Sequence, residues 1–247
     1  MKPIKVLVVD DSLFFRNVLV QCLQTDPNIE VVAQAGDAYQ ARDAIIKYNP
    51  DVMTLDVEMP KMNGIDFLKK LMPQYPLPVV AVSSSNSKVF DALEAGAVDF
   101  VNKPAGLDRT KLNDFVKNEL VTKIKIASTV KVGNMKRVKP IADDMSLKNK
   151  KLRHSVIAIG ASTGGTEAIL EVIKRFGNDI PGIVMVQHMP VGFTKMYADR
   201  LNNQCRILVK EAQTGDIIMP GQALLAPADR QMKKVAWYME CRKWHMI

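Results

Sequence analysis

The pattern that most constrains the fold is an alternation of short apolar runs with amphipathic stretches over residues 1–121. Strand-like runs occur at residues 4–9, 29–33, 51–55, 79–83 and 98–102. A first helix is predicted to follow Ser12, its N-cap, and the others fall near residues 38–48, 64–73, 87–95 and 108–121. Buried strands that alternate with helices are typical of a parallel, doubly wound α/β sheet. The sequence therefore predicts a five-stranded domain of this class.

A second alternation of the same kind starts at Ser155. Its predicted strands are residues 156–159, 182–187, 206–209 and 223–226, and its predicted helices are residues 166–176 and 193–201. Residues 237–247 show no clear periodicity. We therefore expect residues 155–247 to form the first part of a second, Rossmann-like α/β domain.

The net charge of +8 comes from the segment between these two patterns. Residues 122–154 hold ten lysines and arginines against Asp143 and Asp144, whereas the charges of all other residues cancel. The segment lacks periodicity, which indicates a basic, flexible linker. A nucleic-acid-binding arm is the alternative, but no aromatic residue is present to stack on bases. The sequence therefore predicts a tether and no nucleic-acid partner.

Neither a signal peptide nor a membrane span is predicted. The N-terminal apolar run Val6–Val9 is stopped by Asp10 and Asp11, which leaves it too short for either. This pattern predicts a cytoplasmic protein without membrane insertion. The three cysteines, Cys22, Cys205 and Cys241, are far apart and show no metal-ligand spacing, which predicts reduced thiols.

Carboxylates stand at the ends of two predicted strands in the first domain. Asp10 and Asp11 follow the first strand and Asp56 follows the third. Because the carboxyl ends of parallel strands meet at one edge of a sheet, these groups should converge and bind a divalent cation, for which oxygen ligands suit Mg²⁺. Ser83 and Lys103 end the next two strands and are placed to hold the oxygens of a phosphoryl group on Asp56.

A candidate nucleophile, Ser162, lies in the second domain within the segment Gly160-Ala-Ser-Thr-Gly164. Small residues around a serine let the chain turn sharply and present the hydroxyl at the end of a strand. A dinucleotide or Walker phosphate loop is excluded because the required glycine and lysine are missing. A plain strand–helix turn remains the alternative. His188 ends the next predicted strand, beside Ser162, where it can act as the base that a serine nucleophile needs.

The motifs of residues 1–121 resemble a two-component receiver domain. They are Val8-Val-Asp-Asp-Ser12, Asp56-Val-Glu-Met-Pro60 with Gly64, Ser83, and Gly96 to Pro104. The resemblance implies that Asp56 accepts a phosphoryl group from a histidine kinase, with Mg²⁺ held by Asp10, Asp11, Asp56 and the Glu58 carbonyl. It also implies that Ser83 and Phe100 form the switch pair, that Lys103 senses the phosphate, and that the Lys103–Pro104 bond is cis.

The second domain resembles the catalytic domain of CheB, the chemotaxis response-regulator methylesterase family. The matching segments are Ser155 to Thr166, Val186 to Pro190 and Ala226 to Arg230. The resemblance implies a Ser162 nucleophile, a His188 general base and Thr163 lining the site, with no cofactor for the ester reaction. Its substrates would be glutamate methyl esters, and often glutamines, on the cytoplasmic helices of methyl-accepting chemoreceptors.

Part of the family pattern is not found in the sequence. The family's catalytic aspartate lies in a Gly-Met-Gly-x-Asp-Gly segment, which does not occur here, and Asp229 belongs to a different motif. The sequence therefore predicts a catalytic domain truncated or frame-shifted shortly after Lys234, with impaired ester hydrolysis. The alternative is a non-enzymatic response regulator that acts by phosphotransfer and partner binding. A DNA-binding regulator is disfavoured because residues 155–247 begin with strands and not with helices.

Overall fold

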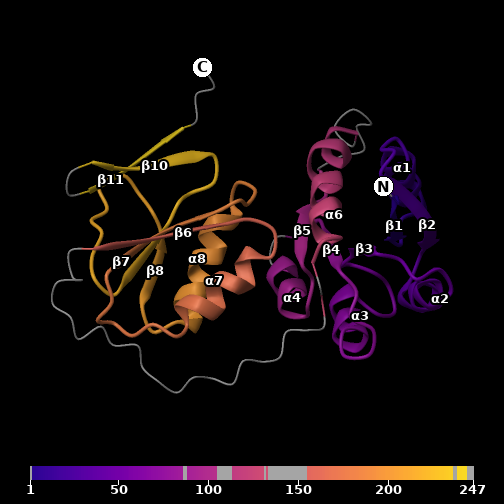
Figure 1. The fold of residues 1–247 in the computed structure, drawn as a ribbon, viewed down its shortest axis with the longest axis horizontal. Helices are drawn as coiled ribbons and strands as arrows, with labels where there is room; N and C mark the ends of the chain where they lie inside the picture. The colour runs from indigo at the N-terminus through magenta and orange to yellow at the C-terminus, as the bar shows by residue number, and fades with distance from the viewer. Residues whose placement is uncertain are drawn as a thin grey trace. The chain divides into compact units, whose positions relative to one another are not determined.

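The chain folds into two compact units, Met1–Val138 and Lys139–Ile247 (Figure 1). This computed structural model describes residues 2–85, 88–104, 113–130, 132, 155–235 and 238–243. Each unit contains its own parallel sheet, as the two alternating patterns predict. No helix of the described residues combines the length and the apolar character that crossing a membrane requires.

The first unit is built on a five-stranded parallel sheet in the order β2-β1-β3-β4-β5. Its strands are β1 (Ile4–Val9), β2 (Ile29–Ala35), β3 (Val52–Asp56), β4 (Val79–Ser83) and β5 (Asp99–Asn102). Strands β3 and β4 are buried along their whole length, and seven of their ten residues are apolar, as expected for inner strands of a covered parallel sheet. This strand order is that of the flavodoxin-like doubly wound fold, and it confirms the five-stranded α/β domain that the sequence predicts.

Helices cover both faces of this sheet (Figure 1). They are α1 (Leu13–Leu23), α2 (Ala38–Tyr48), α3 (Gly64–Leu71), α4 (Lys88–Glu94), η1 (Val116–Leu120) and α6 (Val121–Ala127). Helices α1, η1 and α6 share one core on one face of the sheet, and α2, α3 and α4 pack on the opposite face. The side chain of Ser12 accepts a hydrogen bond from the backbone N–H of Phe15, so the predicted N-cap of α1 is confirmed.

Helix α6 extends the first unit beyond the predicted boundary at residue 121. Lys123, Ile124 and Ala127 are buried against the sheet, so the linker does not begin at residue 122 and that part of the prediction was wrong. The buried charge of Lys123 interrupts the apolar face, which hid the helical periodicity. Residues 131 and 133–154 of the predicted linker lie outside the described residues.

The second unit contains a four-stranded parallel sheet in the order β6-β7-β9-β8, with helices between the strands. Its parallel elements are β6 (Val156–Ala161), α7 (Gly165–Ile173), β7 (Gly182–Gln187), α8 (Phe193–Gln204), β8 (Leu208–Glu211) and β9 (Gln222–Leu225). An antiparallel hairpin follows, formed by β10 (Arg230–Val235) and β11 (Tyr238–Lys243). Strand β11 lies within residues 237–247, for which the sequence showed no clear periodicity and predicted no element.

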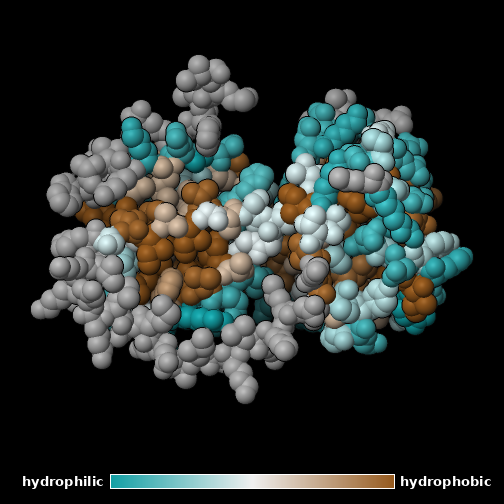
Figure 2. All heavy atoms as spheres, in the orientation of Figure 1, coloured by the Kyte–Doolittle hydropathy of each residue, from teal (hydrophilic) through white to brown (hydrophobic). Residues whose placement is uncertain are grey.

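The two faces of this second sheet are covered to different extents. On β7, Ile183, Met185 and Gln187 are buried on the side of α7. On the opposite face, Val184 packs into the hairpin cluster, whereas Val186 is 54% exposed. Figure 2 shows apolar side chains gathered on the visible face of this unit. Strand β6, at the edge of the sheet, has no fully buried residue.

Candidate functional site

An acidic cluster lies at the carboxyl edge of the first sheet, where the sequence predicts it. Asp10 follows β1, Asp56 ends β3, and carboxylate oxygens of Asp10, Asp11 and Asp56 all lie within 4.8 Å of one another. Asp10 and Asp56 are buried and Asp11 is exposed. This set of hard oxygen donors, open to solvent on one side, fits a Mg²⁺ ion that keeps part of its water shell.

The ammonium group of Lys103 bridges the two buried carboxylates. Its Nζ lies 2.6 Å from Asp56 Oδ2 and 2.8 Å from Asp10 Oδ2, and 4.8 Å from the centre of the Phe15 ring. Burial raises the pKa of Asp10 to about 6, although Lys103 acts in the opposite direction. Burial also tends to lower the pKa of Lys103, but the Asp56 and Asp10 carboxylates outweigh it and raise that pKa. Lys103 therefore stays charged beside Asp56.

Gly64 fixes the loop that follows Asp56. Its N–H donates to the Val57 carbonyl oxygen at 3.0 Å, and a Cβ on Gly64 would lie only 2.3 Å from the backbone oxygen of Asp56. On the other side of the carboxylate, the backbone N–H of Glu58 donates to Asp56 Oδ1 at 2.8 Å. The loop therefore holds the Asp56 side chain through the backbone of the residues that follow it.

Ser83 and Phe100 lie on the neighbouring strands β4 and β5. Phe100 pairs with Ala81, two residues before Ser83, so the Ser83 and Phe100 side chains lie on the same face of the sheet. Ser83 is fully buried; its hydroxyl donates to the Ser85 carbonyl oxygen at 3.1 Å and accepts from the Ser85 N–H at 3.0 Å. Phe100 is 2% exposed. The Lys103–Pro104 bond is trans, so the expected cis bond was wrong.

The Glu58 side chain lies near the cluster but points toward other partners. It accepts a hydrogen bond from the Ser84 hydroxyl and pairs with Lys88 Nζ at 3.0 Å. The Ser84 hydrogen bond, followed by the one from Lys88, lowers the pKa of Glu58. Only the backbone of Glu58 is therefore available to the cluster, as the receiver resemblance implies.

Ser162 and His188 directly follow the ends of two neighbouring strands of the second sheet. Strands β6 and β7 are parallel, and Ala161 pairs with Gln187, so the next residue on each strand is one of the two candidate catalytic residues. The His188 N–H donates to the Ala161 carbonyl oxygen at 3.3 Å, and both candidate side chains are exposed. Thr163 follows Ser162 and is half-buried. Within the described residues, no hydrogen bond joins the Ser162 hydroxyl to the His188 ring.

The turn that carries Ser162 is held by contacts to its backbone. Gly164 has a φ of +73°, and the Gly165 N–H donates to the Ser162 carbonyl oxygen at 2.7 Å. Gln187 Nε2 donates to the same oxygen at 2.9 Å. A Cβ on Gly165 would lie 2.4 Å from Gln187 Oε1, so only glycine fits there. Gln187 was not predicted as a site residue, although it directly precedes His188.

Asp229 lies on the exposed turn before β10 and has a φ of 59°. Within the described residues, it makes no hydrogen bond to His188.

Both units match known families. The family model described as the response regulator receiver domain matches residues 6–116, and the one described as CheB methylesterase matches residues 157–245. The second match extends well past Lys234. The resemblance, which was expected to reach about residue 234, therefore extends to residue 245.

Curated relatives align over nearly the whole chain. The protein-glutamate methylesterase/protein-glutamine glutaminase 2 of Syntrophomonas wolfei is 54% identical over 245 residues, which cover 98% of this chain and 71% of that protein. The enzyme of the same name from Escherichia coli is 46% identical, with 94% of this chain and 67% of that protein covered.

A solved structure resembles the first unit. It is the response regulator domain of Thermotoga maritima CheB, which is 40% identical, with 53% of this chain and 99% of that chain covered and a TM-score of 0.49. The family is shown by two findings. A receiver match precedes a methylesterase match in the chain, and the Syntrophomonas wolfei relative is 54% identical over 98% of the chain. The chain belongs to the CheB family of protein-glutamate methylesterases/protein-glutamine glutaminases.

Proposed function

We propose that this chain is a phosphorylation-regulated hydrolase that demethylates glutamate methyl esters, and deamidates glutamines, on chemotaxis receptors in the cytoplasm. The observation that carries the proposal is the β6–β7 register, which brings Ser162 and His188 together in a chain that also contains the Asp56 cluster. The names of the relatives support the same reaction. The phosphoryl donor would be a chemotaxis histidine kinase.

In the first unit, a carboxylate oxygen of Asp56 attacks the phosphorus atom of a phosphohistidine, and the P–N bond breaks. Asp10, Asp11, Asp56 and the Glu58 carbonyl would hold Mg²⁺, which supplies charge neutralisation for the incoming phosphoryl oxygens. Lys103, already 2.6 Å from Asp56, can turn from the carboxylates to a phosphoryl oxygen. The Ser83 hydroxyl can donate a hydrogen bond to another phosphoryl oxygen once its hydrogen bond to the Ser85 carbonyl oxygen is broken.

In the second unit, His188 takes the proton of the Ser162 hydroxyl while the serine oxygen bonds to the ester carbon. The same histidine then returns the proton to the departing methanol, or to ammonia from a glutamine. Water hydrolyses the acyl-enzyme and restores Ser162. Backbone N–H groups at the start of α7 would stabilise the oxyanion. No cofactor takes part in this sequence of steps.

The receiver chemistry is tested by phosphorylation with a small phosphodonor and Mg²⁺. Asp56→Asn should abolish labelling, whereas the control Asp66→Asn, an exposed aspartate on α3, should leave it unchanged. Labelling of the Asp56→Asn protein at normal stoichiometry would contradict the assignment.

The ester chemistry is tested by methanol release from methylated receptors. We would assay residues 1–247 and a chimera in which the remaining C-terminal segment of the Syntrophomonas wolfei relative follows residue 247. Ser162→Ala and His188→Ala should each remove nearly all activity of the chimera, and the control Ser155→Ala should retain it. The sequence predicts slow hydrolysis by residues 1–247 alone, and this stays a prediction. Phosphorylation of the chimera without ester hydrolysis would favour the non-enzymatic response regulator.

A further inference from the structure

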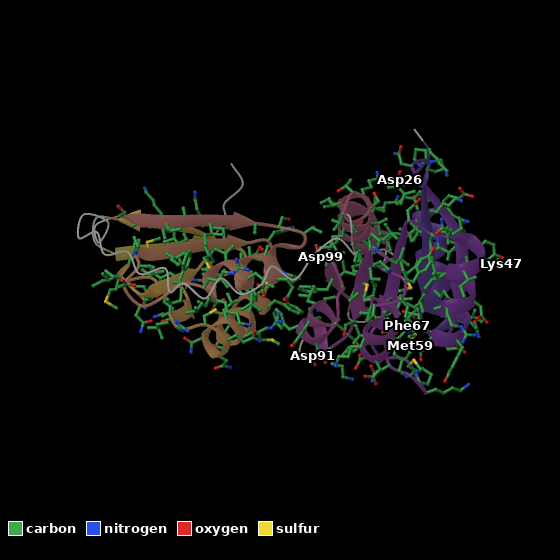
Figure 3. All side chains as sticks on the ribbon, turned by 60° about the horizontal axis from the view of Figure 1, so that its bottom comes forward. Asp26, Lys47, Met59, Phe67, Asp91 and Asp99 are labelled. Carbon is green, nitrogen blue, oxygen red and sulfur yellow. The ribbon has the colours of Figure 1, made fainter. Side chains whose placement is uncertain are left out.

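A buried ion pair lies between β5, an edge strand of the first sheet, and α6, outside the Asp56 cluster. Lys123 of α6 and Asp99 of β5 form it, with Nζ 3.0 Å from Oδ1 and side chains only 9% and 11% exposed. Figure 3 labels Asp99 at the edge of the first unit, beside α6. None of the steps proposed above uses either residue.

The pair contacts Phe100 in three ways. Asp99 Oδ1, which accepts from Lys123, also accepts the backbone N–H of Phe100 at 2.7 Å. Lys123 Nζ donates to the Phe100 carbonyl oxygen at 2.6 Å and lies 5.0 Å from the centre of its ring. The N–H, the carbonyl and the ring of one residue are therefore all held by this pair.

Stability alone is a poor explanation for a lysine at this position. Its neighbours Ile124 and Ala127 are apolar and fully buried, so an apolar side chain at position 123 would continue the same face of α6. A buried ion pair is often no more stabilising than well-packed apolar residues of similar volume. What the lysine adds, and an apolar residue does not, is directed contact with Phe100.

Phe100 is the residue of β5 that the receiver resemblance pairs with Ser83 in the switch. Its ring lies on the same face as Ser83, and its centroid is 6.4 Å from that of the Phe90 ring of α4. If Ser83 moves toward a phosphoryl group on Asp56, it vacates space beside β5. If the Phe100 ring is already buried, it fills the space that Ser83 leaves. The free-energy cost of adopting the phosphorylated conformation is then smaller.

We propose that Lys123, with Asp99, is a positioning residue that holds Phe100 in its buried orientation and thereby favours phosphorylation of Asp56. This inference rests on the proposed receiver function. It extends that function by assigning a role to α6, which contacts Asp99 and Phe100 of β5 through Lys123.

The test is the affinity of the full chain for beryllofluoride, an analogue of the phosphoryl group, at saturating Mg²⁺, measured by calorimetry. Lys123→Met should weaken binding about 5-fold, as expected for losing one cation–π contact and its associated hydrogen bonds. Because Lys123→Met leaves a buried carboxylate unpaired, Lys123→Met/Asp99→Asn is measured as well and should show a similar loss. Lys125→Met is the matched control, since Lys125 lies on the same helix but pairs with Asp26.

A double-mutant cycle separates positioning from general destabilisation. In a Phe100→Leu background the two Lys123 variants should bind beryllofluoride as tightly as Phe100→Leu alone, because the ring through which Lys123 acts is gone. The inference would be overturned if the Lys123 variants lost the same affinity for beryllofluoride with Phe100 as with Leu at position 100. It would also be overturned if they lost no affinity when Phe100 is present. Absence of beryllofluoride binding by the unaltered chain would instead overturn the proposed phosphorylation of Asp56, and with it this extension.

Discussion

Gln187 reaches from the end of β7 to the turn that carries Ser162, where its Nε2 donates to the Ser162 carbonyl oxygen at 2.9 Å. The Gln187 side chain is buried, and its position one residue before His188 ties the two candidate catalytic residues to a common support. A single amide thus links the nucleophile turn to the strand that carries the base.

Replacing this amide should lower ester hydrolysis without removing either reacting group. Gln187→Leu leaves the Ser162 carbonyl with one donor fewer, and we expect methanol release by the chimera to fall about 10-fold through misplacement of the serine. The free energy of unfolding of the second unit should fall by about 1 kcal/mol. Gln204→Leu, at an exposed position on α8, is the control. Unchanged turnover in Gln187→Leu would show that the amide has no positioning role.

Gly165→Ala should destabilise the second unit because the new methyl group meets two neighbours. Its Cβ would lie 2.4 Å from Gln187 Oε1 and 2.5 Å from Ala161 Cβ. Overpacking of this kind costs about 1–3 kcal/mol, which chemical denaturation can measure. Gly160→Ala is the matched control, since a Cβ there meets nothing within 4 Å. Equal stability of the two variants would contradict the packing described for the turn.

Without Mg²⁺, the first unit should become more stable as the pH falls from 7 to 5. Asp10 has a pKa of about 6 in the folded chain against an ordinary value of 3.8, so the folded chain binds this proton more tightly than the unfolded chain. Its protonation therefore adds stability, by about 1 kcal/mol over this interval. Urea denaturation in EDTA measures the effect, and Asp10→Asn should remove it. A difference between the two proteins that is independent of pH would contradict the shifted pKa.

Hydrogen exchange should distinguish the edge strand of the second sheet, β6, from its inner neighbour, β7. Strand β6 lies at the edge of its sheet and has no fully buried residue, whereas the adjacent β7 has four. We expect the hydrogen-bonded amides of β6 to exchange at least about 10-fold faster than those of β7, because edge strands open locally at lower cost. The fully buried strand β3 serves as the protected reference. Similar exchange in β6 and β7 would mean that the edge is more stable than its exposure indicates.

Most of the architecture follows from the sequence because parallel strands are apolar along their length. The apolar runs of β1, β3 and β4 are recognisable in the sequence for this reason. Functional side chains gather at the carboxyl ends of parallel strands, and this rule places Asp10 beside Asp56. The same rule places Ser162 beside His188, because their strands are consecutive in the chain and adjacent in the sheet.

The features that the sequence did not reveal depend on long-range partners. Lys123 looks like part of a charged linker until Asp99, 24 residues earlier, is seen to neutralise it. Gln187 looks like one more polar residue at a strand end until its amide is seen to meet the Ser162 carbonyl. Strand β11 was not predicted because its buried residues, Met239 and Cys241, pack against Ala212 and Leu224, which are distant in the sequence.

The contact between Gly64 and the backbone of Asp56 makes the loop from residue 57 to residue 63 a unit with two fixed ends. One end is the phosphoryl-accepting strand, and the other is the first residue of α3, which has no room for a side chain. Residues between these ends can therefore be exchanged together, for example with the corresponding loop of a relative, provided that the length and the closing glycine are kept. Such loop grafts offer a way to alter the surroundings of Asp56 without disturbing the sheet beneath it.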